Sequence, residues 1–149
     1  MKCLALGSLL LTAFACGPKP GPDEAGSATV ALPDVPFEQL DHDQKIQFMK
    51  QVVVPTMAPL FQRHDAEKFA DFGCKTCHSE AADRGHFHMP NDKLPKLNFA
   101  NLRKFEQHDI DFMTNEIKPM MAKLLQEPEH TPEEPQGFGC LHCHQQTTE

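Results

Sequence analysis

The heptapeptide Phe72-Gly73-Cys74-Lys75-Thr76-Cys77-His78 occurs in two versions in this chain. The second is Phe138-Gly139-Cys140-Leu141-His142-Cys143-His144, close to the C-terminal end. Each version begins with Phe-Gly, places two cysteines three positions apart and follows them directly with histidine. Because three positions are nearly one helical turn, each version brings two thiols and an imidazole close together.

Cys-x-x-Cys-His is the attachment signal of c-type haem. The two thiols add to the vinyl groups of the porphyrin as thioethers, and the histidine that follows binds the iron as its proximal ligand. The sequence therefore predicts two covalently bound haem c groups. Their attachment points are Cys74, Cys77, Cys140 and Cys143, and their proximal iron ligands are His78 and His144.

Paired cysteines also occur in structural zinc sites and in dithiol redox proteins. A structural zinc site usually separates its pairs by about 15 to 20 residues, whereas Cys77 and Cys140 lie much farther apart. Zinc also does not require a histidine after each pair. A thioredoxin-like dithiol is expected beside a βαβ pattern, which this sequence lacks. A structural zinc-binding protein is kept as a further alternative.

The N-terminal region has the pattern of an export signal. Lys2 precedes a short apolar run, and residues 1–15 are predicted to be a signal peptide that is too short to span a bilayer. The sequence Ala13-Phe14-Ala15-Cys16 resembles the processing site of bacterial lipoproteins, in which the cysteine after the cleavage point is lipidated. That resemblance implies lipidation of Cys16 and attachment to a bacterial membrane on the periplasmic side of the cell envelope.

Residues 16–36 are rich in proline and glycine and have little apolar surface to bury. Such a composition favours extended conformations, so we expect a flexible tether. The folded domain is predicted to occupy residues 37–149.

Within that domain a longer unit repeats. The stretch from Phe48 to Phe61 aligns with the stretch from Phe112 to Leu125 at a constant offset of 64 residues, and each contains a proline two residues before a methionine. Apolar residues recur at spacings of three and four, which is typical of helices. Pro55 and Pro119 should make each helix kink or restart. We predict an all-α, small cytochrome c-like domain of two helix-loop-CxxCH units with long loops. The expected apolar positions are Leu40, Ile46, Phe48, Met49, Val52, Val53, Met57, Leu60 and Phe61, and Ile110, Phe112, Met113, Ile117, Met120, Met121, Leu124 and Leu125.

Met57 and Met121 occupy equivalent positions in the two units and are candidates for the distal iron ligands. Methionine on an apolar helical face more often serves core packing. The unit nevertheless resembles the haem-binding units of the tetrahaem cytochrome subunit of photosynthetic reaction centres, in which a helix with the axial methionine precedes each Cys-x-x-Cys-His. The resemblance covers residues 46–78 and 110–144, and it implies ligation by His78 with Met57 and by His144 with Met121. Rival ligands in the loop after the first motif are Met89, His88 and His86.

The formal net charge of −7 makes nucleic acid an improbable partner. Together these features predict an exported, membrane-anchored dihaem cytochrome c that carries electrons between redox proteins of the cell envelope and is not an enzyme. One alternative is a small peroxidase-like haem enzyme, which needs an iron with an open distal side. A haem subunit of a larger respiratory complex is the other.

Overall fold

Two long helical stretches form the frame of the molecule. The first runs through α1 (His42–Phe48), η2 (Met49–Val53) and α2 (Val54–His64), and the second through α4 (Gln107–Phe112), η5 (Met113–Ile117) and α5 (Lys118–Leu125). The computed structural model describes residues 34–149. Within that range the only β-structure is two isolated bridges, so the all-α prediction is confirmed. The shorter helices are η1 (Phe37–Gln39), α3 (Cys74–His78), η3 (Ser79–Arg84), η4 (Leu102–Lys104) and η6 (Cys140–His142).

Both long helices contain a π-helical turn, and the two turns lie 64 residues apart in the sequence. The Val54 amide donates to the Met49 carbonyl and the Lys118 amide to the Met113 carbonyl, which is the i to i−5 pattern of a π-helix. Pro55 and Pro119 follow within two residues of these turns. A proline lacks an amide hydrogen and crowds the preceding turn, and the wider π turn relieves that crowding. The disturbance that we expected at each proline therefore takes the form of a π turn inside a continuous helix.

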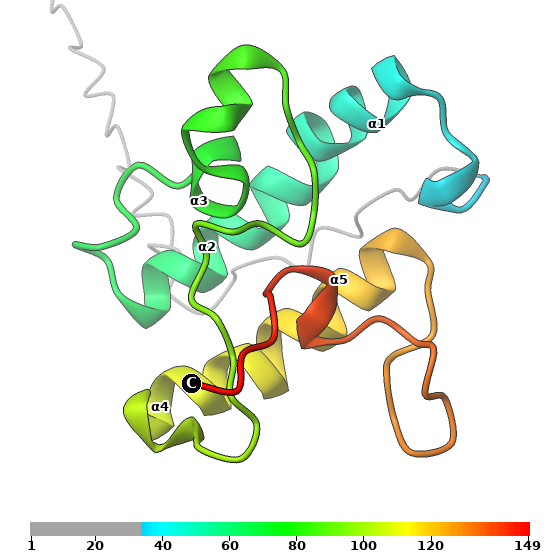
Figure 1. Ribbon diagram of the computed structural model, residues 1–149. Helices are drawn as coiled ribbons and strands as arrows, with labels where there is room; N and C mark the ends of the chain where they lie inside the picture. The colour runs from blue at the N-terminus through cyan, green and yellow to red at the C-terminus, as the bar shows by residue number, and fades with distance from the viewer. Residues whose placement is uncertain (1–33) are drawn as a thin grey trace, which may run out of the picture.

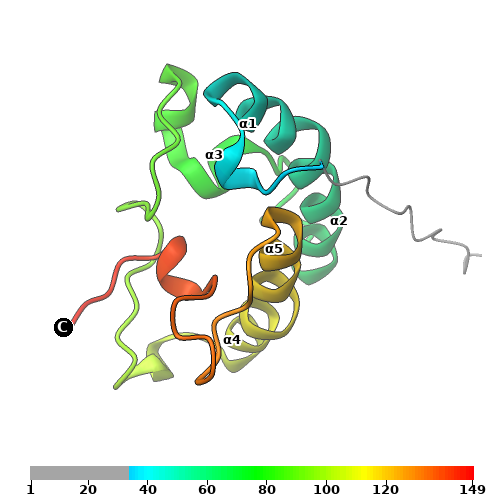
Figure 2. The same cartoon turned by 90° about the vertical axis from the view of Figure 1, so that its right-hand side faces the viewer.

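The two long helices pack against each other, with α2 contacting η5 and α5 contacting η2. Figures 1 and 2 show the cysteine-bearing segments α3 and η6 on the same side of this helix pair. The buried apolar residues are Phe48, Val53, Met57, Phe61, Phe112, Ala122, Leu124, Leu125 and Phe138. Every apolar position predicted for the two helices is buried or packs against this core, except Ile46 and Ile110, which are partly exposed.

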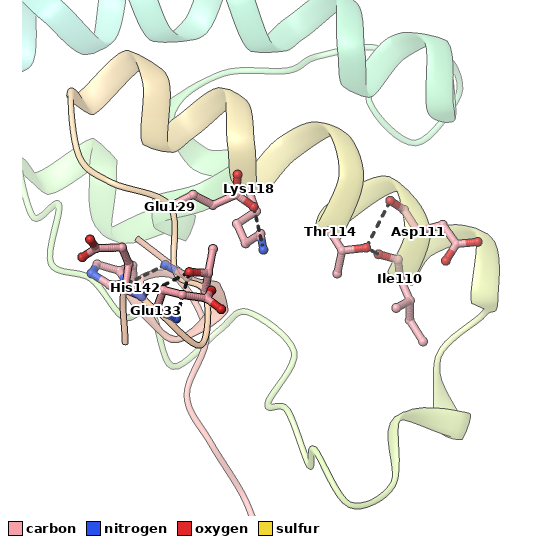
Figure 3. A network of polar contacts seen from close by, with 10 residues as sticks. Ile110, Asp111, Thr114, Lys118, Glu129, Glu133 and His142 are labelled. Carbon is pink, nitrogen blue, oxygen red and sulfur yellow. Dashed lines mark hydrogen bonds and ion pairs between the residues drawn. The ribbon is translucent and has the colours of Figure 1, made fainter. Parts of the chain in front are cut away.

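Polar contacts stabilise the second long helix and join it to the loop before the second motif (Figure 3). Within η5 the Thr114 hydroxyl donates to the carbonyl oxygens of Ile110, at 2.8 Å, and of Asp111, at 3.3 Å. Lys118 at the start of α5 forms an ion pair with Glu129 in the loop before the second motif, with 2.8 Å between Nζ and Oε1. The loop that leads to Cys140 is thus fixed to α5.

A second polar link joins the end of α2 to the beginning of α4. His64 Nε2 lies 2.6 Å from Asp109 Oδ1, and the His64 side chain is only 7% exposed. The hydrogen bond from His64 lowers the pKa of the Asp109 carboxyl, with a smaller contribution from the nearby Lys68. Asp109 is therefore an ionised carboxylate at neutral pH.

Candidate functional site

The phenylalanine at the head of each motif anchors it to the core. The Phe72 ring centroid lies 4.8 Å from that of Phe61, which in turn lies 5.2 Å from that of Phe112. Phe138 is itself part of the core, at 5% exposure. Each motif therefore begins at an aromatic ring that packs on or in the core of the helix pair, which explains why both copies begin with phenylalanine.

The turn that follows is closed in the same way in both copies. The Gly73 amide donates to Thr76 Oγ1 and the Gly139 amide donates to His142 Nδ1, each at 3.0 Å. In both cases the acceptor is the side chain three residues on, which satisfies an amide that the first helical turn leaves free. His142 thus caps its own motif.

The four cysteines are free thiols. Burial raises the pKa of Cys77 to about 11 and that of Cys143 to about 12, and the proximity of Cys77 adds to the second shift. A raised pKa keeps a thiol protonated, whereas dithiol exchange needs thiolate. Among residues 34–149, the cysteines do not join any group of three metal-ligating side chains within reach of one ion. These observations favour neither the zinc nor the dithiol interpretation.

Asn91 connects the two motifs. Its side-chain amide donates to the Cys77 carbonyl and its backbone amide donates to the Cys143 carbonyl, each at 3.0 Å. Only 7% of Asn91 is exposed, so both bonds are shielded from solvent. Because a single residue bonds both carbonyls, the second cysteine of one motif is fixed close to the second cysteine of the other. No sequence pattern singled out Asn91, since the bond partners lie in distant segments.

The loop after the first motif also holds the second. The Pro95 carbonyl lies 2.9 Å from His144 Nδ1, and Leu97 exchanges backbone hydrogen bonds of 2.9 Å with Gln145 and Thr147. Because a carbonyl only accepts, His144 must carry its proton on Nδ1, and this leaves the lone pair of Nε2 for a ligand bond. Histidines that bind metals usually make such a contact through their other nitrogen.

His78 has different surroundings. Its Nδ1 is buried without a hydrogen-bond partner, and burial lowers the pKa of the ring, so the imidazole is neutral at pH 7. His78 borders an open pocket of about 780 Å³, whose wall also includes His86, His88 and Arg84. Two of the predicted rival ligands thus share a pocket with the first proximal histidine.

The predicted methionine ligands lie on the two long helices. Met57 in α2 is 2% exposed and is the most deeply buried large side chain described, while Met121 in α5 is partly buried against the same core. Neither of them lines the pocket beside His78, and the rival Met89 does not line it either. The structure therefore brings His86 and His88 to the pocket of His78 and leaves both helix methionines in the packed layer.

These residues suit covalent haem by their chemistry. Each motif offers two cysteines that form no disulfide and lie next to an imidazole, and His144 has the tautomer that a proximal ligand needs. A methyl group added at Gly73 would meet no protein atom within 4 Å, so the chain leaves space beside the first motif. The unpaired Nδ1 of His78 is the one feature that lacks the usual supporting contact.

The predicted signal peptide, Cys16 and most of the tether lie outside the described residues. Within residues 34–149 no helix has the length and apolar character needed to cross a membrane. In comparisons with known proteins, no family model, no curated protein and no solved structure matches this chain.

Proposed function

We propose that this protein is an exported, membrane-anchored dihaem cytochrome c that carries electrons between redox proteins of the cell envelope. The observation that carries the proposal is the pair of Phe-Gly-Cys-x-x-Cys-His motifs, which Asn91 holds side by side on one face of a helix pair. An all-α frame with equivalent π turns and prolines before each motif supports a cytochrome c-like domain of two units.

In this proposal each residue has a defined task. Cys74 and Cys77 bind one haem and Cys140 and Cys143 the other, while His78 and His144 are the proximal iron ligands. The iron supplies one-electron chemistry, and the protein sets its potential through ligands, burial and hydrogen bonding. Met57 and Met121 are the proposed distal ligands because they occupy the same position after the π turn and the proline of each helix.

Covalent haem content is the primary test. We expect expression with the cytochrome c maturation machinery to give two haems that remain on the denatured chain, measured by haemochrome spectroscopy and mass spectrometry. Cys74→Ala with Cys77→Ala should leave one haem, and so should Cys140→Ala with Cys143→Ala. A periplasmic product that carries zinc and no haem would refute the proposal.

The membrane anchor has a separate test. Labelled fatty acid should appear on the mature chain, and Cys16→Ser should remove the label and release the protein from the membrane fraction. A wild-type protein that is unlabelled and wholly in the soluble periplasmic fraction would refute lipidation and leave the haem proposal standing.

The pocket beside His78 favours a peroxidase-like enzyme as a second candidate. An enzyme of this kind needs an open coordination position with acid and base groups nearby, and His86, His88 and Arg84 line this pocket. This candidate predicts a five-coordinate first haem that reacts with hydrogen peroxide. A six-coordinate spectrum for both haems, with no peroxidase turnover, would exclude it and support the carrier.

A further inference from the structure

The link between α2 and α4 contains a group of side chains that the cytochrome proposal does not use. His64, His108 and Asp109 each offer one ligand atom, and the three atoms lie within 4.8 Å of one another. His64 is the last residue of the first long helix, whereas the other two lie in the first turns of the second. The group therefore joins the two helices at their ends.

One member of the group is held rigidly. The His64 ring lies parallel to that of Phe112, with 4.0 Å between centroids and 6° between planes, and its side chain is 7% exposed. The His108 ring stacks on His64 at 4.2 Å. A buried, stacked imidazole beside a carboxylate is a preorganised ligand, because its orientation is fixed before any ion arrives.

The other two members can adjust. His108 is exposed and the Asp109 side chain is 46% exposed, so either can turn without disturbing the core. Donors around a tetrahedral zinc lie about 3.3 Å apart, given metal–donor distances of about 2.0–2.2 Å. His64 Nε2 and Asp109 Oδ1, now 2.6 Å apart, need only separate slightly, and the hydrogen-bonded proton leaves to solvent as the ion binds.

We propose that His64, His108 and Asp109 form a binding site for a divalent transition-metal ion, with Zn²⁺ as the representative ion. Two imidazoles and one carboxylate suit zinc and its neighbours better than calcium or magnesium, which prefer oxygen ligands. Three protein ligands leave a fourth position for water. The bound ion clasps the end of α2 to the beginning of α4, and this role is independent of the haem motifs.

Calorimetric titration of the mature, chelator-treated holoprotein with zinc chloride tests the site. We expect one zinc ion per chain and a rise in Tm when zinc is added, since an ion that binds only the folded state stabilises it. His108→Ala and Asp109→Asn should each raise the Kd at least about tenfold and abolish the rise in Tm. His108 is exposed, and an asparagine at position 109 can still accept the hydrogen bond from His64 through its side-chain carbonyl, so both variants should fold.

His42→Ala is the matched control, because His42 is also an exposed histidine in the first turn of a long helix. Its Kd for zinc should equal that of the wild type. If His108→Ala, Asp109→Asn and His42→Ala all bind zinc with the affinity of the wild type, the proposed site is wrong. It is also wrong if only His86→Ala or His88→Ala abolishes zinc binding, because the ion then lies in the loop after the first motif. Haem content is measured on the same samples, so failure of this site and failure of the cytochrome proposal are distinguishable.

Discussion

The first motif forms the short α-helix α3 and borders an open pocket. The second motif forms only the 3-10 turn η6, and the loop after the first motif holds its last residue, His144. His78 Nδ1 has no partner and His144 Nδ1 donates to Pro95. The two motifs share five of seven residues, so the difference comes from the chain around them. Residues 91–97 hydrogen-bond to Cys143, His144 and the residues that follow, whereas the His78 ring makes an edge contact with Phe87.

This asymmetry implies that two haems bound here would have different potentials. A proximal histidine that donates through Nδ1 is a stronger electron donor to the iron, and this favours the oxidised state. We therefore expect the haem of the second motif to have the lower potential of the two. Potentiometric titration of the two single-haem cysteine variants would assign each value to its motif.

If the protein binds two haems as proposed, the largest effect should come from their removal. Only nine apolar side chains are buried in residues 34–149, which is a small core for a stretch of this length. We expect the haem-free chain, produced without the maturation machinery, to lose its cooperative thermal transition in circular dichroism. A haem-free protein that melts cooperatively near the Tm of the holoprotein would contradict this prediction.

The next largest effect should come from the helix methionines. If Met57 and Met121 bind iron, Met57→Leu and Met121→Leu should each remove the sulfur-to-iron absorption of one haem and shift its potential. Leucine has a similar volume, so the packing cost should stay below about 1.5 kcal/mol, and Met57 should be the costlier because it is 2% exposed.

Three further variants test the rival ligands. Met89→Leu, His86→Ala and His88→Ala should leave both spectra unchanged. A changed first-haem spectrum in either histidine variant, with Met57→Leu silent, would assign the distal position to the pocket beside His78.

A smaller loss of stability is expected at the contact between the motifs. Asn91→Ala removes the side-chain donor to the Cys77 carbonyl and leaves that acceptor unsatisfied, at a cost of about 1–3 kcal/mol. Asn98→Ala is the matched control. Asn98 accepts the Ala100 amide as Asn91 accepts the Lys93 amide, two residues on in each case, but Asn98 is only partly buried. Denaturant unfolding of the two holoproteins measures the difference, and equal losses would mean that the buried bond to Cys77 contributes nothing.

The sequence pattern predicted the helices well and the site only in part. The spacing of residues such as Phe48, Phe61 and Leu124 reports burial, because one helical face must be apolar wherever two helices pack. Ala122 was missed because its small side chain gives a weak apolar signal, although it is 3% exposed. The two motifs could be recognised in the sequence because their residues lie at fixed spacing within seven positions. By contrast, Asn91, Pro95 and the group at His64 act through contacts between segments far apart in the chain, and these depend on how the loops fold back.

The smallest predicted effect is a difference in stability between Gly73→Ala and Gly139→Ala, the equivalent substitutions in the two motifs. A methyl group at Gly139 would lie 3.0 Å from His130 Cβ, whereas at Gly73 it would meet no protein atom within 4 Å. Both glycines have extended backbone, so neither substitution introduces backbone strain. Gly139→Ala should therefore destabilise the protein by about 1 kcal/mol, at the low end of overpacking costs, because the exposed His130 side chain needs to move only slightly to relieve the contact. Gly73→Ala should leave the denaturant midpoint unchanged, because the added methyl group contacts no protein atom.

Absorption spectra of the same samples show whether the added methyl group disturbs the first haem. A disturbed first haem in Gly73→Ala would mean that the cofactor, and not the chain, requires glycine there, while a larger loss of stability at Gly73 than at Gly139 with intact spectra would contradict the packing described for both motifs.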